Sequence, residues 1–179
     1  PNISADIILS SSLLPDEGSA NKTEGLFLVK PGSYKINGFR FEGIASPHDR
    51  LGGRRFGMST LWKWEQSGLT FAHLGGAASP LTIENRLLIG SPDILFIAVG
   101  GGAKVYNGYE AAQVVEVLKP KIVIPVQYQL QDKGKRSNCD QEGVEPFLAA
   151  MGDYMVKKVG IKYNPKRKIS KIPSIHLLE

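Results

Sequence analysis

The sequence predicts an α/β fold in which helices lie outside layered sheets. The first half of the chain reads as short strands and hairpins, whereas the second half alternates apolar runs with segments of helical spacing. Continuous apolar runs at 94–99 and 121–126 are typical of covered strands, which pair in parallel through helical crossovers. We therefore expect a layered sandwich with its helices outside.

The first strands are short and lie close to turn signals. Apolar runs at 5–10 and 26–29 predict two strands, separated by a loop rich in serine, proline and glycine. Residues 34–44 alternate apolar and polar side chains around Asn37-Gly38, which is a strong signal for a tight hairpin. These segments together predict a β meander at the start of the chain.

A further hairpin leads to a strand that ends in glycine. Residues 60–65 place Trp62 and Trp64 on one face, and we expect them to pair antiparallel with the strand at 68–74. In many α/β enzymes the residue at such a strand end carries chemistry. Here that residue is Gly76, which has no side chain.

Helical spacing begins after this strand. Ser79 or Thr82 is placed to cap a first helix, with Glu84 in its first turn. Later helices are expected to end before Lys119-Pro120 and to begin near Pro146. The expected elements are helices at 82–88, 109–118 and 144–151, a mobile loop at 131–142, and a final strand at 174–179.

Composition indicates one globular domain over residues 1–179, with the basic segment 156–179 as part of it. The chain has 42% hydrophobic and 22% charged residues, which are ordinary globular values. The single cysteine, Cys139, excludes an internal disulfide and is not expected to be a nucleophile, since no base is evident nearby. No run approaches the roughly 18 apolar residues of a membrane helix. We expect a soluble intracellular protein, in the cytoplasm or inside an organelle, without a visible targeting segment.

The net charge is +5, and the basic residues are unevenly spread, with two clusters. One is Arg50, Arg54 and Arg55, and the other occupies the last 25 residues. Such clusters can face phosphates or acidic partners, although a solvated basic tail is the interpretation that we favour for the second. Binding of nucleic acid through these arginines and the tail therefore stays an alternative.

A set of short motifs runs along the chain in a fixed order. They are Asp6–Leu9, Lys30–Tyr34, Gly38, Gly43-Ile44, His48-Asp49, His73–Gly75, Asp93–Leu95, Val99–Gly101, Glu110–Ala112 and Lys119–Pro125. Taken together, these motifs resemble the metallo-β-lactamase superfamily, and within it the predicted Zn-dependent hydrolases of the ascorbate-phosphate lactonase-like branch. The resemblance covers about residues 5–151 and implies an αββα sandwich with a metal site at one edge of the sheets.

The resemblance also implies where metal ligands would stand, and most of these positions have changed. The family's H-x-H-x-D-H motif falls here on Ser12, Leu14, Asp16 and Glu17, so only the aspartate is unchanged. The histidine after the hairpin is kept as His48. The bridging aspartate and the last histidine are replaced by two poor ligands, Gly76 and Gln127.

Three functions remain open. A catalytic zinc needs about three nitrogen, sulfur or carboxylate ligands, and only Asp16, Glu17 and His48 are strong donors. We therefore favour a pseudoenzyme with no catalytic residue and no cofactor, which acts as a scaffold and binds protein partners. The alternatives are a hydrolase with an altered or single-zinc site, in which Asp16 and His48 would be catalytic, and nucleic-acid binding. Because the family has further N-terminal strands, we also expect the sandwich to be incomplete at its N-terminal edge.

Overall fold

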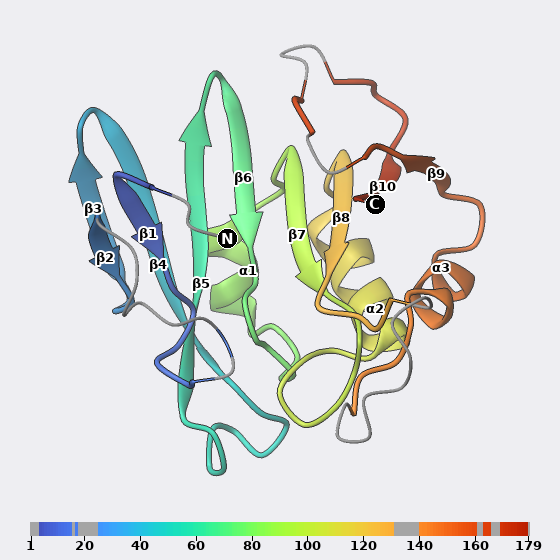
Figure 1. Cartoon of the computed structure of the whole chain (residues 1–179), viewed down its shortest axis with the longest axis horizontal. Helices are drawn as coiled ribbons and strands as arrows, with labels where there is room; N and C mark the ends of the chain where they lie inside the picture. The colour runs from blue at the N-terminus through green and yellow to red at the C-terminus, as the bar shows by residue number, and fades with distance from the viewer. Residues whose placement is uncertain are drawn as a thin grey trace.

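The structure, a computed structural model, describes residues 4–15, 17, 25–130, 140–160, 163–165 and 169–178. These residues form one large sheet and one small one, and Figure 1 shows the large sheet crossing the whole molecule. In spatial order the large sheet contains β3 (Gly32–Ile36), β4 (Phe39–Pro47), β5 (Met58–Gln66), β6 (Leu69–His73), β7 (Ile94–Ala98), β8 (Ile122–Val126), β10 (Ser174–Leu177) and β9 (Met155–Lys158).

Strand pairing changes direction along this sheet. The β3–β4, β4–β5 and β5–β6 pairs are antiparallel, whereas the pairs from β6 to β9 are parallel. The hairpin predicted at Asn37-Gly38 is present, and both residues have positive φ (50° and 83°). The predicted switch from antiparallel hairpins to parallel crossovers is confirmed, and so is the α/β fold class.

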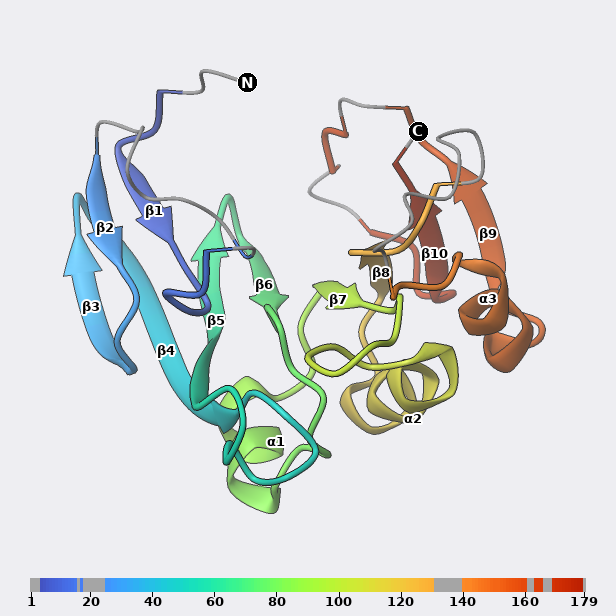
Figure 2. The ribbon, with the colours of Figure 1, turned by 60° about the horizontal axis from the view of Figure 1, so that its bottom comes forward.

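Three helices cover one face of the large sheet. They are α1 (Ile83–Ile89), α2 (Gly108–Leu118) and α3 (Glu145–Met151), and Figure 2 shows α1 and α2 on the same side. Fully buried residues such as Leu61, Leu95 and Val115 fill the main core between sheet and helices. Their burial gives most of the hydrophobic stabilisation of the fold, at about 25 cal/mol per Å² of apolar surface.

Local sequence signals fix where the helices begin. Thr82, rather than Ser79, caps α1, and Asn85 completes a capping box. Asn107 and Glu110 form the same arrangement at the start of α2. Four orphan N–H groups at each helix start need partners, so these boxes stabilise the two helix starts.

The opposite face carries the small sheet, which corrects the expected meander. Strands β1 (Ile7–Leu9) and β2 (Leu26–Leu28) pair in parallel and apart from the hairpin that follows. The long segment between them permits a parallel crossover, and their apolar side chains pack on Phe41 and Trp62 of the large sheet. The result is a second layer over β3–β5.

The basic tail is also more ordered than expected, because Met155–Lys158 forms the edge strand β9 beside β10. All four residues are exposed, and Lys157 and Lys158 place charge on a sheet edge, where charge opposes edge-to-edge association. Part of the tail, including Lys162 and residues 166–168, lies outside the described residues, as does most of the loop expected at 131–142.

Candidate functional site

One edge of the large sheet gathers the positions that the resemblance assigns to metal ligands. Because β4, β6 and β8 run in the same direction, their carboxyl ends lie at the same edge. His48 follows β4, and Gly76 and Gln127 follow β6 and β8. The segment after β1 reaches this edge too, through a hydrogen bond from the Thr60 amide to the Ser11 carbonyl (2.8 Å).

Gly75 permits that close approach. It has a positive φ of 55°, and a Cβ at this position would lie 2.2 Å from the Cβ of Ser11. Only glycine therefore lets the segment that contains Ser12 pass beside the end of β6. The neighbouring Trp62 indole also donates to the Ser10 carbonyl at 2.8 Å, which fixes the same segment.

At the centre of this edge, Ser12, Glu17 and His48 form a hydrogen-bonded cluster. Glu17 Oε2 accepts from the Ser12 hydroxyl at 2.6 Å and lies 2.8 Å from His48 Nε2. The side chains of His48 and Glu17 are 0% and 4% exposed. Glu17 and His48, the two strongest candidate metal ligands described at this edge, are therefore hydrogen-bonded to each other.

Both pKa shifts favour the charged pair. Burial alone would raise the pKa of Glu17, but hydrogen bonds from His48 and Ser12 lower it below its ordinary value. Burial alone would lower the pKa of His48, and the hydrogen bond to Glu17 raises it instead. The cluster is thus a buried carboxylate–imidazolium ion pair across the weakly acidic range.

Gly76 is part of how this pair packs. A Cβ at position 76 would lie 2.6 Å from His48 Cε1 and 2.7 Å from Glu17 Oε1. Contacts this short force a neighbour to move, and both neighbours are buried. Glu17 and His48 therefore occupy the space that a side chain at position 76 would need.

A small cavity of about 80 Å³ opens beside Glu17. Lys104 Nζ lies 3.8 Å from Glu17 Oε1, which has no hydrogen-bond partner among the described residues. Sequence reasoning missed Lys104 and Asp140, although Lys104 lies only two residues after the glycine-rich segment Gly100–Gly102. The cavity is lined by Glu17, Gly101, Ala103, Lys104, Val105, Gln127, Asp140 and Gln141.

The donors that the structure describes do not complete a site for a catalytic metal. Within the part of the chain that the structure describes, no three His, Cys, Asp or Glu residues are grouped to hold an ion. Leu14 supplies only a backbone amide, which donates to Ser12 Oγ at 3.2 Å. Asp16, the remaining strong donor from the sequence, lies outside the described residues. Two donors that bond each other fall short of the roughly three that zinc requires.

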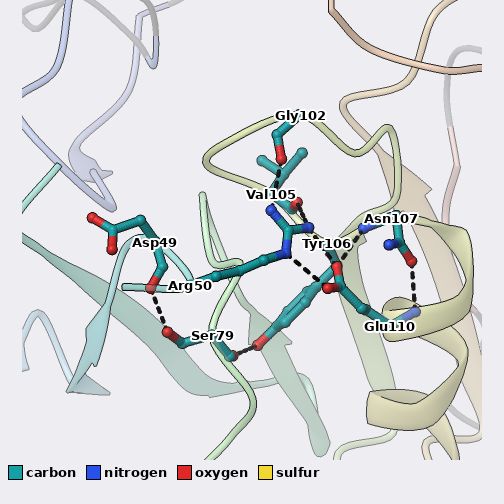
Figure 3. A network of polar contacts seen from close by, with 8 residues as sticks. All are labelled: Asp49, Arg50, Ser79, Gly102, Val105, Tyr106, Asn107 and Glu110. Carbon is teal, nitrogen blue, oxygen red and sulfur yellow. Dashed lines mark hydrogen bonds and ion pairs between the residues drawn. The ribbon is translucent and has the colours of Figure 1, made fainter. Parts of the chain in front are cut away.

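A second polar network, drawn in Figure 3, begins next to His48. The Asp49 carboxylate accepts hydrogen bonds from four backbone N–H groups of the loop 51–56, at 2.8–3.0 Å. Burial would raise the pKa of Asp49, but these four bonds lower it. The Asp49 carbonyl accepts from Ser79, whose own carbonyl accepts from the Tyr106 hydroxyl (2.6 Å). The loop is thereby fixed from both sides.

Arg50 connects this loop to the start of α2. Its guanidinium binds both carboxylate oxygens of Glu110 (2.8 and 2.5 Å) and donates to the carbonyls of Gly102 and Val105. The hydrogen bond to Glu110 raises the pKa of Arg50. Of the three arginines proposed for nucleic acid, Arg50 is therefore engaged, whereas Arg54 and Arg55 are exposed and Arg55 lies over the Phe56 ring.

The other titratable candidates lie apart from the Glu17 cluster. His73 accepts a hydrogen bond from the Gly75 amide and stacks on Phe96. His176 lies in β10, 3.0 Å from the Ser174 hydroxyl. These contacts fit structural roles for both histidines. Cys139 lies outside the described residues.

Layered sheets with helices outside place this chain in the class of α/β sandwiches. The model of the beta-lactamase superfamily domain matches residues 1–127, so this chain belongs to the beta-lactamase superfamily. The resemblance inferred from the sequence motifs is thereby confirmed. No curated protein sequence matches the chain.

Solved structures with this fold extend over nearly the whole chain. A protein from Thermotoga maritima, described as a Zn-dependent hydrolase of the metallo-β-lactamase superfamily, is 23% identical with a TM-score of 0.80, and the match covers 99% of this chain and 84% of that one. A protein from Parabacteroides distasonis, described as a metal-dependent hydrolase, is 14% identical with a TM-score of 0.59, over 97% and 76% of the two chains. At these identities the likeness shows a shared fold, and this chain is shorter than both neighbours.

None of the described helices is long and apolar enough to span a membrane.

Proposed function

We propose that this chain is a catalytically degenerate member of its family, in which an internal ion pair stands in place of a metal site. The observation that carries the proposal is the bond between Glu17 and His48 (2.8 Å), made at the edge where the resemblance places the ligands. A buried charge must be paired, and these two side chains pair each other. Neither then needs an ion for neutralisation.

The neighbouring positions support the same proposal. The Ser12 hydroxyl donates a hydrogen bond to Glu17, and the absence of a side chain at Gly76 leaves room for both members of the pair. Lys104 adds a second positive charge, 3.8 Å from Glu17 Oε1, on the cavity side. A divalent ion at this place would have to compete with two cations that are already attached to the chain.

The proposed role is that of a scaffold for a protein partner, which would bind at the rim of the former metal cleft. The rim is formed by the segment Gly100–Gly102, Gln127 and Asp140. Gly101, Gln127 and Asp140 line the cavity beside Glu17. Arg50 holds the rim through the carbonyls of Gly102 and Val105. Such a surface can keep its shape without catalysis, which is what a binding function requires.

The altered-site hydrolase stays as a second candidate, because one observation favours it. It requires Asp16, Glu17 and His48 to converge beside a pocket, and Glu17 and His48 do so. In that case Asp16 would be the third donor.

Metal content of the purified protein tests the proposal. The natural chain is compared by inductively coupled plasma mass spectrometry with a restored variant, Ser12→His, Leu14→His, Glu17→His, Gly76→Asp and Gln127→His. A matched control carries Ser12→Gln, Leu14→Gln, Glu17→Gln and Gly76→Asn, which are similar in size and poor as ligands. Circular dichroism verifies that all three proteins fold.

We expect no stoichiometric zinc, iron or manganese in the natural chain or the control, and metal in the restored variant. About one metal per natural chain would overturn the proposal and favour the altered-site hydrolase, with Asp16→Asn as the variant that should lose the metal. Binding of single-stranded or duplex nucleic acid that weakens steeply with salt would instead favour the nucleic-acid alternative.

A further inference from the structure

The outer surface of α1 and α2 contains a groove that the proposed function does not use. Its volume is about 350 Å³, and apolar side chains such as Leu81, Tyr106 and Val114 line much of it. Figure 2 shows the two helices beside each other below the sheet, away from β1 and β2. The groove therefore lies on a different face from the small sheet.

Large apolar side chains are exposed on the two helices that carry this groove. Val117 of α2 lines the groove and is 44% exposed. Ile83 and Leu87, one helical turn apart on α1, are 76% and 77% exposed, and Tyr109 of α2 is 67% exposed. Single exposed apolar residues are ordinary, but several on two adjacent helices are typical of an interaction surface.

Each wall of the groove also carries an exposed charge of opposite sign. Arg86 of α1 lines the groove and is exposed, and its Nε–H donates to the Leu81 carbonyl at 3.0 Å. Glu116 of α2 lines the opposite wall. Neither forms an ion pair with another residue in the described part of the chain, although Arg50 and Glu110 nearby pair with each other.

This charge pattern is self-complementary. In a two-fold symmetric dimer, residue i of one protomer meets residue j of its partner, and j meets i. A two-fold axis midway between Arg86 and Glu116 would place Arg86 of each protomer against Glu116 of its partner, and it would bury exposed apolar side chains of both helices, such as Leu87 and Val117. We infer that a second copy of this chain docks on the α1–α2 groove and forms a symmetric homodimer.

Charge reversal tests this geometry directly. Analytical ultracentrifugation over a concentration series is run on the natural chain, Arg86→Glu, Glu116→Arg and the double variant. Each single reversal places like charges together at both symmetric contacts, so we expect the dissociation constant to rise about tenfold. The double variant restores both pairs and should recover dimerisation.

Mixing the two single variants gives the sharpest result. The Arg86→Glu protomer is acidic at both positions 86 and 116, and the Glu116→Arg protomer is basic at both. In their heterodimer, each of the two symmetric contacts therefore joins an acidic residue to a basic one. The mixture should therefore dimerise although each variant alone does so weakly. The exposed residues Lys35 and Asp153 serve as controls away from the groove, and Lys35→Glu and Asp153→Arg should leave dimerisation unchanged.

The apolar part has its own test, since Leu87→Glu should also weaken the dimer without changing the melting temperature of the monomer. A natural chain that stays monomeric up to roughly 0.1 mM would overturn the inference. So would a dimer that is insensitive to Arg86, Leu87 and Glu116, because its interface would then lie elsewhere. Neither result bears on the metal content that tests the proposed function.

Discussion

His48 and Arg50 are two residues apart in the sequence, but they serve regions of different character. His48 turns into a buried cluster with Glu17, in which both side chains are almost fully hidden from solvent. Arg50 turns the other way and joins Glu110 and two loop carbonyls, with about a third of each charged side chain exposed. One region is a hidden ion pair, and the other is a partly solvated network.

The two regions also differ in how completely they satisfy their polar atoms. Asp49 and Arg50 use their hydrogen-bonding groups on backbone atoms of neighbouring loops. Glu17 Oε1 and His48 Nδ1 are buried, and neither has a hydrogen-bond partner among the described residues. The side chains of Asp49 and Arg50 are thus fully hydrogen-bonded, whereas the Glu17–His48 cluster, at the positions that the resemblance assigns to metal ligands, is not. In this loop, Asp49 and Arg50 hold the backbone in place, whereas His48 forms the buried ion pair with Glu17.

The largest expected effect comes from breaking the buried pair. Glu17→Ala leaves His48 in a buried site without its partner, so we expect the free energy of unfolding to fall by about 3–5 kcal/mol. Urea denaturation followed by circular dichroism measures it. Glu110→Ala is the comparison in the other region, and a loss as large there would show that the two regions are equally important for stability.

A side chain at position 76 should lower the free energy of unfolding by less than the loss of Glu17 does. Gly76→Ala places a Cβ within 2.6 Å of the His48 ring, so we expect a loss of about 1–3 kcal/mol. The cost should shrink when Glu17→Ala is also present, because the carboxylate no longer competes for the space. Additive effects in this double-mutant cycle would contradict the proposed packing.

The Arg50 network should give a smaller and more local effect. Arg50→Ala removes partly exposed hydrogen bonds to Glu110 and two carbonyls, for an expected loss of about 1–2 kcal/mol. Hydrogen exchange should speed up in the segment 100–107, whereas the Thr60 amide beside the cluster stays protected. Faster exchange at both places would show that the regions are not independent.

The smallest expected effect is the change with pH in the stability that the Glu17–His48 pair contributes. The raised pKa of His48 gives stability that is present below its ordinary value of 6.5 and is lost as pH rises through the raised pKa. The lowered pKa of Glu17 gives stability that is present above 4.5 and is lost as pH falls through the lowered pKa. The difference in stability between the natural chain and His48→Gln should therefore be largest between 4.5 and 6.5. A difference that is constant from pH 4 to 9 would mean that the pair is not ionised.

Most of the fold could be predicted from local patterns. Alternation, continuous apolar runs and caps are short-range signals, and they located the hairpin at Asn37-Gly38 and the helix that ends at Leu118. The parallel pairing of β1 with β2 was missed because a crossover and a meander leave the same local signature. Strand β9 was missed because its lysines resemble a solvated tail.

The site could be predicted only in part, for a similar reason. The family motifs located Ser12, Glu17, His48, Gly76 and Gln127, and the structure brings these positions to one edge. The bond between Glu17 and His48 joins residues 31 apart in the chain, and no short-range pattern encodes it. Lys104 and Asp140 come from two further loops, so their approach to Glu17 depends on the assembled sheet.

The absent side chain at Gly76 limits the order in which this edge of the sheet could acquire a metal ligand. Because Glu17 and His48 occupy the space beside Gly76, an aspartate placed at position 76 alone would clash with both side chains. Changing Glu17 first would make room, but it would leave His48 buried without its partner. Packing around one glycine therefore couples three positions, and no single substitution among them is neutral.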